Sequence, residues 1–84
     1  MEQENAMDQM GFDRELNCRG MACPLPILRA KKAIDQLASG QVLKLIATDP
    51  GSLNDVNAWS RRTGNDLLRH EKSGADFVFF LRKK

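Results

Sequence analysis

Hydrophobic and polar residues alternate near the start of the chain and then recur with helical spacing. Phe12, Arg14 and Leu16 alternate with acidic or amide residues, which predicts a short strand with one buried face. Over residues 24–38 apolar positions recur every three or four residues, which predicts an amphipathic helix. The residues on its inward face are Ile27, Ala30, Ile34, Leu37 and Ala38. Gly40 follows and suits the left-handed backbone position after a last helical turn.

The middle of the chain predicts a buried strand followed by a second helix. Residues 42–48 are rich in Leu, Ile and Val, as in a central strand. The turn that follows offers two helix starts. Either Asp49 is the N-cap with Pro50 at the first helical position, or Ser52 is the N-cap with Asp55 three residues later. The helix then ends at Gly64. Its inward residues are Leu53, Val56 and Trp59.

Two further strands, over residues 66–72 and 75–82, complete the chain, and the Ser73-Gly74 connection between them predicts a hairpin. The element order is therefore β-α-β-α-β-β. Because βαβ crossovers are right-handed, both helices fall on one face of a four-stranded mixed sheet, and the fold class is an α+β two-layer sandwich. Leucine and phenylalanine side chains on the opposite face leave open whether that face is solvated or pairs with another chain. We expect residues 1–10 to be a tail and residues 11–84 a single domain.

Charge and hydropathy narrow the function classes. The net charge of +2 is small and mixed in sign, so no nucleic-acid partner is expected. The basic pair Arg61-Arg62 and the basic tail Arg82-Lys83-Lys84 are interpreted as solvated ends, and a weak docking surface is the alternative. No apolar run approaches the roughly 20 residues that span a bilayer, so no membrane is expected. The polar, acidic N-terminus does not resemble a secretory signal, which favours the cytoplasm, where thiols stay reduced.

The most informative motif is Cys23-Pro24-Leu25-Pro26, in which a thiol directly precedes the predicted first helix. Prolines are tolerated in a first helical turn, since the N–H groups they lack would have no intrahelical partner there. Pro24 also biases Cys23 towards the extended backbone of an N-cap residue. Of the two amides that such a cap usually engages, only that of Leu25 remains, because Pro26 has no N–H. A helix N-terminus favours thiolate over thiol, and the thiolate is the nucleophile. Cys23 is therefore the candidate reactive residue.

The other residues that could take part in chemistry have no supporting motif around them. Cys18 closes the first predicted strand, without a proline neighbour, and is expected to pack near the sheet edge. A role as resolving thiol for Cys23 stays open because the spacing is short. His70 is interpreted as a surface or half-buried strand residue rather than a catalytic base. Two cysteines and one histidine without a Cys-x-x-Cys pair do not make a metal site. No phosphate-binding loop or cofactor motif is present in the sequence.

Four parts of the chain resemble the TusA/SirA-like sulfur carrier proteins. They are the sequence from Cys18 to Leu28, the basic helix after it, Thr48-Asp49-Pro50-Gly51-Ser52 and the C-terminal hairpin. The resemblance covers residues 12–84. It implies the β-α-β-α-β-β sandwich and a sulfur relay: a cysteine desulfurase or another sulfur donor loads a persulfide on the Cys-Pro-x-Pro cysteine. A downstream acceptor protein then takes the sulfur for tRNA thiolation, molybdenum-cofactor maturation or another pathway. No cofactor is implied beyond this transient cysteine persulfide.

Transferred to this chain, the resemblance makes Cys23 the persulfide site, with Pro24 and Pro26 shaping its loop. Arg19 and Gly20 match the family's approach to the motif.

Three further positions have weaker assignments. Asp49 matches the turn before the second helix, Asn17 stands where many relatives have aspartate, and Cys18 occurs only in some members. The chain is thus interpreted as a sulfurtransferase-type carrier rather than a self-contained enzyme. Two alternatives stay open: a regulatory or interaction module without sulfur transfer, and a thiol redox protein that uses Cys18 and Cys23.

Overall fold

Strands and helices alternate in the order read from the sequence. The computed structural model describes residues 11–22 and 24–84. The elements are β1 (Arg14–Cys18), α2 (Leu25–Asp35), β2 (Val42–Ala47), α3 (Ser52–Thr63), β3 (Asp66–Ser73) and β4 (Asp76–Arg82). The strands form one sheet in the order β1-β2-β4-β3. β1 and β2 are parallel, and β4 runs antiparallel to both of its neighbours, β2 and β3. The predicted mixed sheet is confirmed.

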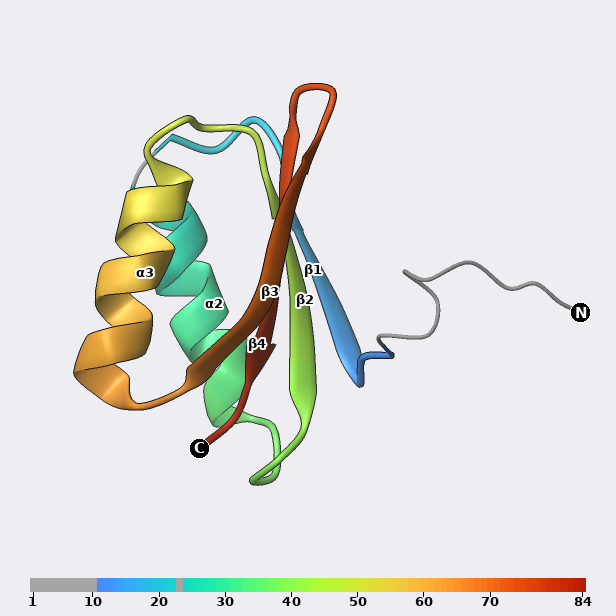
Figure 1. Cartoon of the computed structure of the whole chain (residues 1–84), viewed down its shortest axis with the longest axis vertical. Helices are drawn as coiled ribbons and strands as arrows, with labels where there is room; N and C mark the ends of the chain where they lie inside the picture. Colours follow the sequence, from blue (N-terminus) through green and yellow to red (C-terminus); the bar gives the residue numbers. More distant parts are fainter. Residues whose placement is uncertain (1–10, 23) are drawn as a thin grey trace, which may run out of the picture.

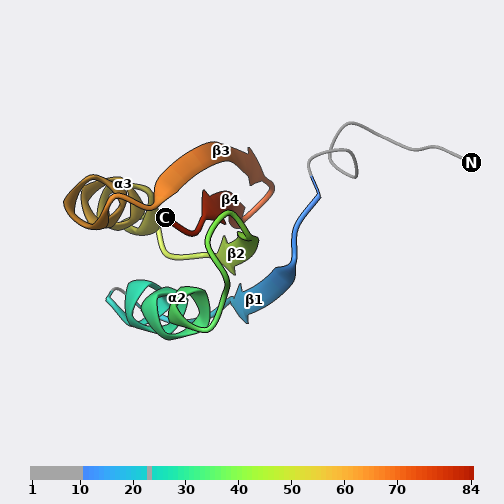
Figure 2. The same ribbon diagram turned by 90° about the horizontal axis from the view of Figure 1, so that it is seen from below.

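Both helices cover the same face of the sheet, so the molecule has two layers (Figures 1 and 2). Between the layers lies the main core, in which Leu43, Leu45 and Phe79 from the two central strands are buried. Ala30 and Ile34 of α2 and Val56 and Trp59 of α3 close it from the helix side. The α+β sandwich predicted from periodicity is therefore observed.

The bounds of the first helix differ from the prediction. α2 ends at Asp35 rather than at residue 38, and Ala38, expected to point inward, is exposed. Gly40 has the expected positive φ of 89°, but it lies in the turn before β2 and does not cap α2. There the Gln41 amide donates to the Ala38 carbonyl, and the Gly40 amide donates to the Lys83 carbonyl at 2.8 Å. The chain thus turns towards β2 soon after Asp35, through a local bond and one to a residue distant in the chain, which local propensity does not register.

The start of α3 matches neither predicted cap. Gly51 is the N-cap, and no side chain caps the helix. The Asp49 carboxylate instead accepts a hydrogen bond from the Gly51 amide, and the Asp49 carbonyl accepts one from the Ser52 amide. Asp49 thus builds a local turn, a frequent use of aspartate. At the other end, Gly64 is the left-handed C-cap as predicted, with a φ of 84°.

The hairpin turn lies one residue later than predicted. Ser73 pairs with Asp76, so the two residues of the turn are Gly74 and Ala75. Gly74 has a φ of 62°, and no residue other than glycine in the described chain has a positive φ. A glycine at the first central position is what a type II′ hairpin turn requires.

The first strand also differs from its prediction. β1 begins at Arg14, whose side chain is exposed, and Phe12 lies before the strand rather than on its buried face. The Phe12 ring packs beside Phe80, with ring centroids 6.5 Å apart, on the sheet face away from the helices. Leu16 packs on the opposite side, against the main core.

Charged side chains cover the sheet face that no helix covers. Ile46, Val78 and Phe80 form a second buried cluster there, and Phe80 is only 1% exposed. Ion pairs on this same face of the sheet join Glu15 to Lys44, Arg19 to Asp76, Arg69 to Glu71 and Arg82 to Asp66. The apolar stripe of this face is therefore packed beneath the protein's own side chains.

Candidate functional site

The loop from β1 to α2, which contains the Cys-Pro-Leu-Pro motif, begins with a tight turn. The Asn17 side-chain oxygen accepts a hydrogen bond from the Arg19 amide at 3.0 Å. The Met21 amide then donates to the Cys18 carbonyl at 3.2 Å, which closes a four-residue turn. Gly20 occupies the third position of this turn with a φ of 80°, the backbone geometry of a type II turn. Gly20 thus acts through its backbone.

A hydrogen bond ties this loop to the loop that precedes α3. The Gly20 amide donates to the Thr48 hydroxyl at 2.8 Å. Thr48 follows β2, and the next residue, Asp49, holds the turn before α3. Since β1 and β2 are parallel neighbours, their carboxyl ends meet at one edge of the sheet. Gly20 and Asp49, both singled out from the sequence, therefore lie on two loops that meet at this edge.

Arg19 is directed to the uncovered face of the sheet. Its Nε and Nη2 atoms donate to one oxygen of Asp76, at 3.0 and 2.9 Å. Asp76 begins β4 and shares a sheet face with Val78. The hydrogen bond with Arg19, and the positive charge behind it, hold the pKa of Asp76 below its usual value. Arg19 is therefore an anchor for the start of the loop and is already engaged by a carboxylate.

The two prolines take the first-turn positions that proline tolerates. Pro24 is the N-cap of α2, and its carbonyl accepts hydrogen bonds from the amides of Ile27 and Leu28, each at 3.2 Å. Pro26 is the second helical residue and is buried. Neither proline removes a donor that the helix would use. The α2 N-terminus thus begins at the motif, as expected.

The predicted N-cap was wrong by one residue. Pro24, rather than Cys23, is the N-cap. The Leu25 amide, expected from the sequence to be the one amide left for a Cys23 cap, donates to the Ala22 carbonyl at 2.9 Å. Cys23 itself lies outside the described residues, so its reactivity and surroundings stay a prediction. Its neighbours Ala22 and Pro24 are both exposed.

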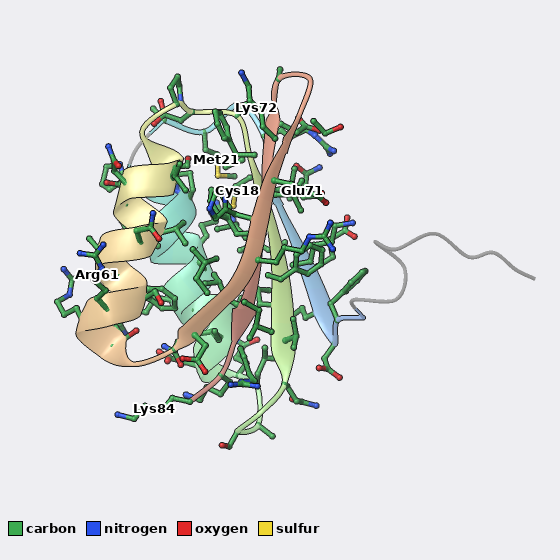
Figure 3. All side chains as sticks on the ribbon, in the orientation of Figure 1. Cys18, Met21, Arg61, Glu71, Lys72 and Lys84 are labelled. Atoms are coloured by element: carbon green, nitrogen blue, oxygen red, sulfur yellow. The ribbon has the colours of Figure 1, made fainter. Side chains whose placement is uncertain are left out.

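Cys18 is buried, unlike the exposed Ala22 and Pro24. It is 0% exposed and belongs to the main core, where the half-buried Met21 packs against the same cluster (Figure 3). Burial raises the pKa of the Cys18 thiol, and the charge of Arg29 opposes this only in part. A thiol with a raised pKa is mostly protonated at neutral pH and is a poor nucleophile.

The remaining candidates contribute no further group. His70 lies in β3, exposed, with its ring centroid 6.4 Å from that of Phe79. Within residues 11–22 and 24–84, no three His, Cys, Asp or Glu side chains are arranged to hold a metal ion. No helix in that same part of the chain is long and apolar enough to cross a membrane.

Sequence reasoning missed Thr48, Asp76 and the outer face of α2. Thr48 and Asp76 carry no local signal, since their partners are distant in the chain. Leu25 and Leu28 did carry a signal in the sequence, since they are three residues apart on the helix and are not among the residues predicted to face inward. In the structure their side chains are 48% and 53% exposed. Leu25 and Leu28 thus form an exposed apolar pair on the outer face of α2.

The β-α-β-α-β-β sandwich makes the protein a small two-layer domain, an architecture that recurs among solved structures. A SirA-like protein from Desulfitobacterium hafniense superimposes with a TM-score of 0.74 over 83% of this chain and 96% of its own, at 22% sequence identity. That likeness concerns the fold. In sequence, residues 14–83 match the family described as Sulfurtransferase TusA. The chain belongs to the TusA family.

Individual relatives agree with this assignment over nearly their whole length. The sulfur carrier protein TusA of Allochromatium vinosum is 51% identical over 72 residues, which cover 86% of this chain and 95% of the relative. The Bacillus subtilis protein YrkI is 46% identical over 74 residues, 88% of this chain and 99% of the relative.

Proposed function

We propose that this protein is a sulfur carrier that holds sulfane sulfur as a persulfide on Cys23 and relays it to an acceptor protein. The contrast between its two cysteines carries the proposal. Cys18 is fully buried with a raised pKa, whereas the residues on both sides of Cys23 are exposed and α2 begins directly after it. A relative named sulfur carrier protein TusA, 51% identical, supports the same role.

The chemistry requires one exposed thiolate and no cofactor. The Cys23 thiolate attacks the outer sulfur of a donor persulfide, R–S–SH. A new S–S bond forms to Cys23, the donor's S–S bond breaks, and the donor leaves as the thiolate R–S⁻. The product, Cys23–S–SH, transfers its outer sulfur to an acceptor thiolate by the same exchange. Each step moves one sulfur atom without an external oxidant or reductant.

Such a carrier needs two kinds of protein partner. The donor is a cysteine desulfurase or another protein that presents a persulfide, and the acceptor is a thiol-bearing protein of a tRNA-thiolation, molybdenum-cofactor or other sulfur-relay pathway. The loop anchors at Thr48 and Asp76 support this role, since they fix the start of the motif loop to the loop before α3 and to the first residue of β4. A thiol that must stay reduced between cycles favours the cytoplasm.

The two alternatives differ in their support. A redox cycle between Cys18 and Cys23 would need Cys18 as a nucleophile, and its burial and raised pKa disfavour that role. A regulatory module without sulfur transfer would make no use of Cys23, and it predicts that Cys23→Ala leaves the cellular phenotype intact.

Mass spectrometry of the intact protein tests the proposal. After incubation with a cysteine desulfurase and cysteine, we expect a mass increase of about 32 Da, one sulfur atom, that maps to Cys23 and disappears on reduction. Cys18→Ala, which keeps Cys23, is the matched control and should still be loaded. Loading of Cys23→Ser to the wild-type level would show that the sulfur resides elsewhere.

A further inference from the structure

An open groove of about 670 Å³ lies between α2 and the edge strand β1. These two elements lie side by side at the end of the molecule away from β3 (Figure 2). The groove follows α2 from Leu25, two residues after Cys23, to Gln36 just beyond its last turn. A helix of that length extends about 16 Å, which is the span of roughly five residues of extended chain. The groove is thus a long surface that begins at the motif.

Exposed leucines form one side of the groove. Leu25 is 48% exposed and Leu28 is 53% exposed, and both line the groove together with the half-buried Leu16 of β1. Leucines packed against a core are normally covered, as Leu43 and Leu45 are here. Leu25 and Leu28 therefore present apolar area that a partner could remove from water.

The charges of the groove are all positive. Its lining includes Arg14, Arg29 and Lys32 and no acidic residue. Arg29 and Lys32 have no carboxylate within ion-pair distance anywhere in residues 11–22 and 24–84, and Arg14 is hydrogen-bonded to the neutral amide of Gln36. The lining residue Lys31 is the exception, since it pairs with Asp35 at 3.1 Å. Arg19 and Arg82, on the uncovered face of the sheet, are paired with carboxylates, whereas Arg61 and Arg62 of α3, like Arg29 and Lys32, have no ion pair among the described residues.

We propose that this groove docks an acidic segment with apolar side chains, contributed by the protein that exchanges sulfur with Cys23. Glutamate or aspartate of the segment pairs with Arg29 and Lys32, and its apolar side chains cover Leu25 and Leu28. Because the groove starts two residues from Cys23, a segment seated in it holds the partner's reactive sulfur close to the motif. The inference rests on the proposed function and adds the chemistry of the partner.

An extended conformation of the segment fits the position of β1. β1 is the outermost strand and pairs only with β2 within the described chain. The free edge of such a strand can accept another extended chain through backbone hydrogen bonds. Backbone pairing would supply affinity. Because every second side chain of an extended segment points to the same face, acidic and apolar residues two positions apart would face α2 together and supply specificity.

A nucleic acid fits the same groove less well. Its basic residues alternate with leucines, which a phosphate backbone leaves uncovered, and no aromatic side chain lines the groove to stack on a base. The net charge of +2 is also small for a nucleic-acid-binding domain. The observations therefore favour an acidic protein segment.

A peptide titration followed by amide chemical shifts of the isotope-labelled full chain tests the docking. The probe is a short peptide in which glutamate and leucine take turns at every second position, with polar uncharged residues between them, so that both face α2 when the peptide is extended. A peptide with glutamine in place of glutamate is its control. We expect shifts confined to β1 and α2, and weaker binding of the glutamine peptide and at higher salt. The double variant R29E/K32E should weaken binding by at least about tenfold.

Arg61 and Arg62 provide the matched control. They lie in the last turn of α3, where Arg61 points away from the molecule (Figure 3), and R61E/R62E changes the net charge by the same amount as R29E/K32E. R61E/R62E should bind the peptide as the wild type does. Equal losses in both variants would mean that only overall charge matters and would overturn the proposal.

Other occupants give different results and would also overturn it. A second copy would appear as self-association that R29E/K32E abolishes, and a nucleic acid as binding of a single-stranded RNA in preference to the peptide. The titration uses reduced protein and does not depend on persulfide chemistry. Failure of wild-type Cys23 to accept sulfur would therefore refute the carrier role separately, whatever the outcome of the titration.

Discussion

The Gly20 amide donates a hydrogen bond to the Thr48 hydroxyl at 2.8 Å, and this contact joins the two loops at the carboxyl ends of β1 and β2. Gly20 stands three residues before Cys23, so the contact fixes the approach to the motif. On its other side, Thr48 is followed by Asp49, whose carboxylate shapes the start of α3. The position of the motif loop is thus coupled to the α3 loop through one side-chain hydroxyl.

Thr48→Val removes this hydroxyl and keeps the volume of the side chain. We expect faster hydrogen exchange of the Gly20 amide, because it loses its acceptor, and a decrease in the free energy of unfolding of about 1 kcal/mol or less, since exposed Gly20 can bind water instead. Thr48→Ser keeps the hydroxyl and should retain slow exchange. Unchanged Gly20 exchange in the valine variant would show that the hydrogen bond does not order the loop.

Gly20→Ala tests the turn itself. A Cβ at Gly20 would meet no atom within 4 Å, so the substitution causes no clash, but the φ of 80° is strained for any residue with a Cβ. We expect the free energy of unfolding to fall by about 1 to 2 kcal/mol. Gly20→Asn should be less destabilising, because asparagine tolerates the left-handed region better than alanine does. Denaturant unfolding of both variants measures the difference.

The Arg19–Asp76 ion pair makes stability depend on pH in the acidic range. The pKa of Asp76 is lower in the folded state than in the unfolded chain, where it is about 4. The folded state therefore binds the Asp76 proton less readily, and the pair stabilises it above about pH 4. This contribution is lost as the pH falls through the lower folded-state pKa. Asp76→Asn should lower the Tm slightly at neutral pH and have no effect near pH 2; an equal deficit at both pH values would exclude the ion pair as its cause.

Phe80 and Leu28 are both apolar residues away from the main core, yet they should respond differently to truncation. Phe80 is 1% exposed beneath charged side chains, so Phe80→Ala should reduce the free energy of unfolding by about 3 to 5 kcal/mol. Leu28 is 53% exposed, and Leu28→Ala should change it by less than about 0.5 kcal/mol. Urea unfolding of the two variants gives the comparison. A large loss for Leu28→Ala would assign that leucine to folding rather than to docking.

The sequence was sufficient for the fold because its main signals are periodic. Apolar alternation and helical spacing predicted the element order, and the apolar run at residues 42–48 predicted that β2 is a central strand. Element ends were less accurate, since hydrogen bonds such as that from Gly40 to Lys83 join residues far apart in the chain. The alternatives Asp49 and Ser52 both missed the α3 N-cap for a similar reason, because the Asp49 carboxylate was already used in its own turn.

The candidate site was predictable where it depends on local geometry. Pro24 and Pro26 at the start of a helix follow from backbone stereochemistry. Gly20 was singled out only by the resemblance to the family, and the structure shows its role as the positive-φ residue of a turn. The partner of Arg19 did not follow, since Asp76 is 57 positions away and meets it only across the folded sheet. The groove beside α2 could not be predicted from the sequence either, because its second wall comes from β1.

Cys18 allows the carrier and redox interpretations to be separated in the folded protein. Cys23→Ser leaves Cys18 as the single thiol of the chain. Because Cys18 is 0% exposed and burial raises the pKa of its thiol, we expect alkylation by iodoacetamide to be at least about a hundredfold slower in the native variant than in denaturant. The rate should rise with denaturant as the core opens. Rapid alkylation under native conditions would instead show that Cys18 reaches solvent readily, and a resolving role opposite Cys23 would then regain support.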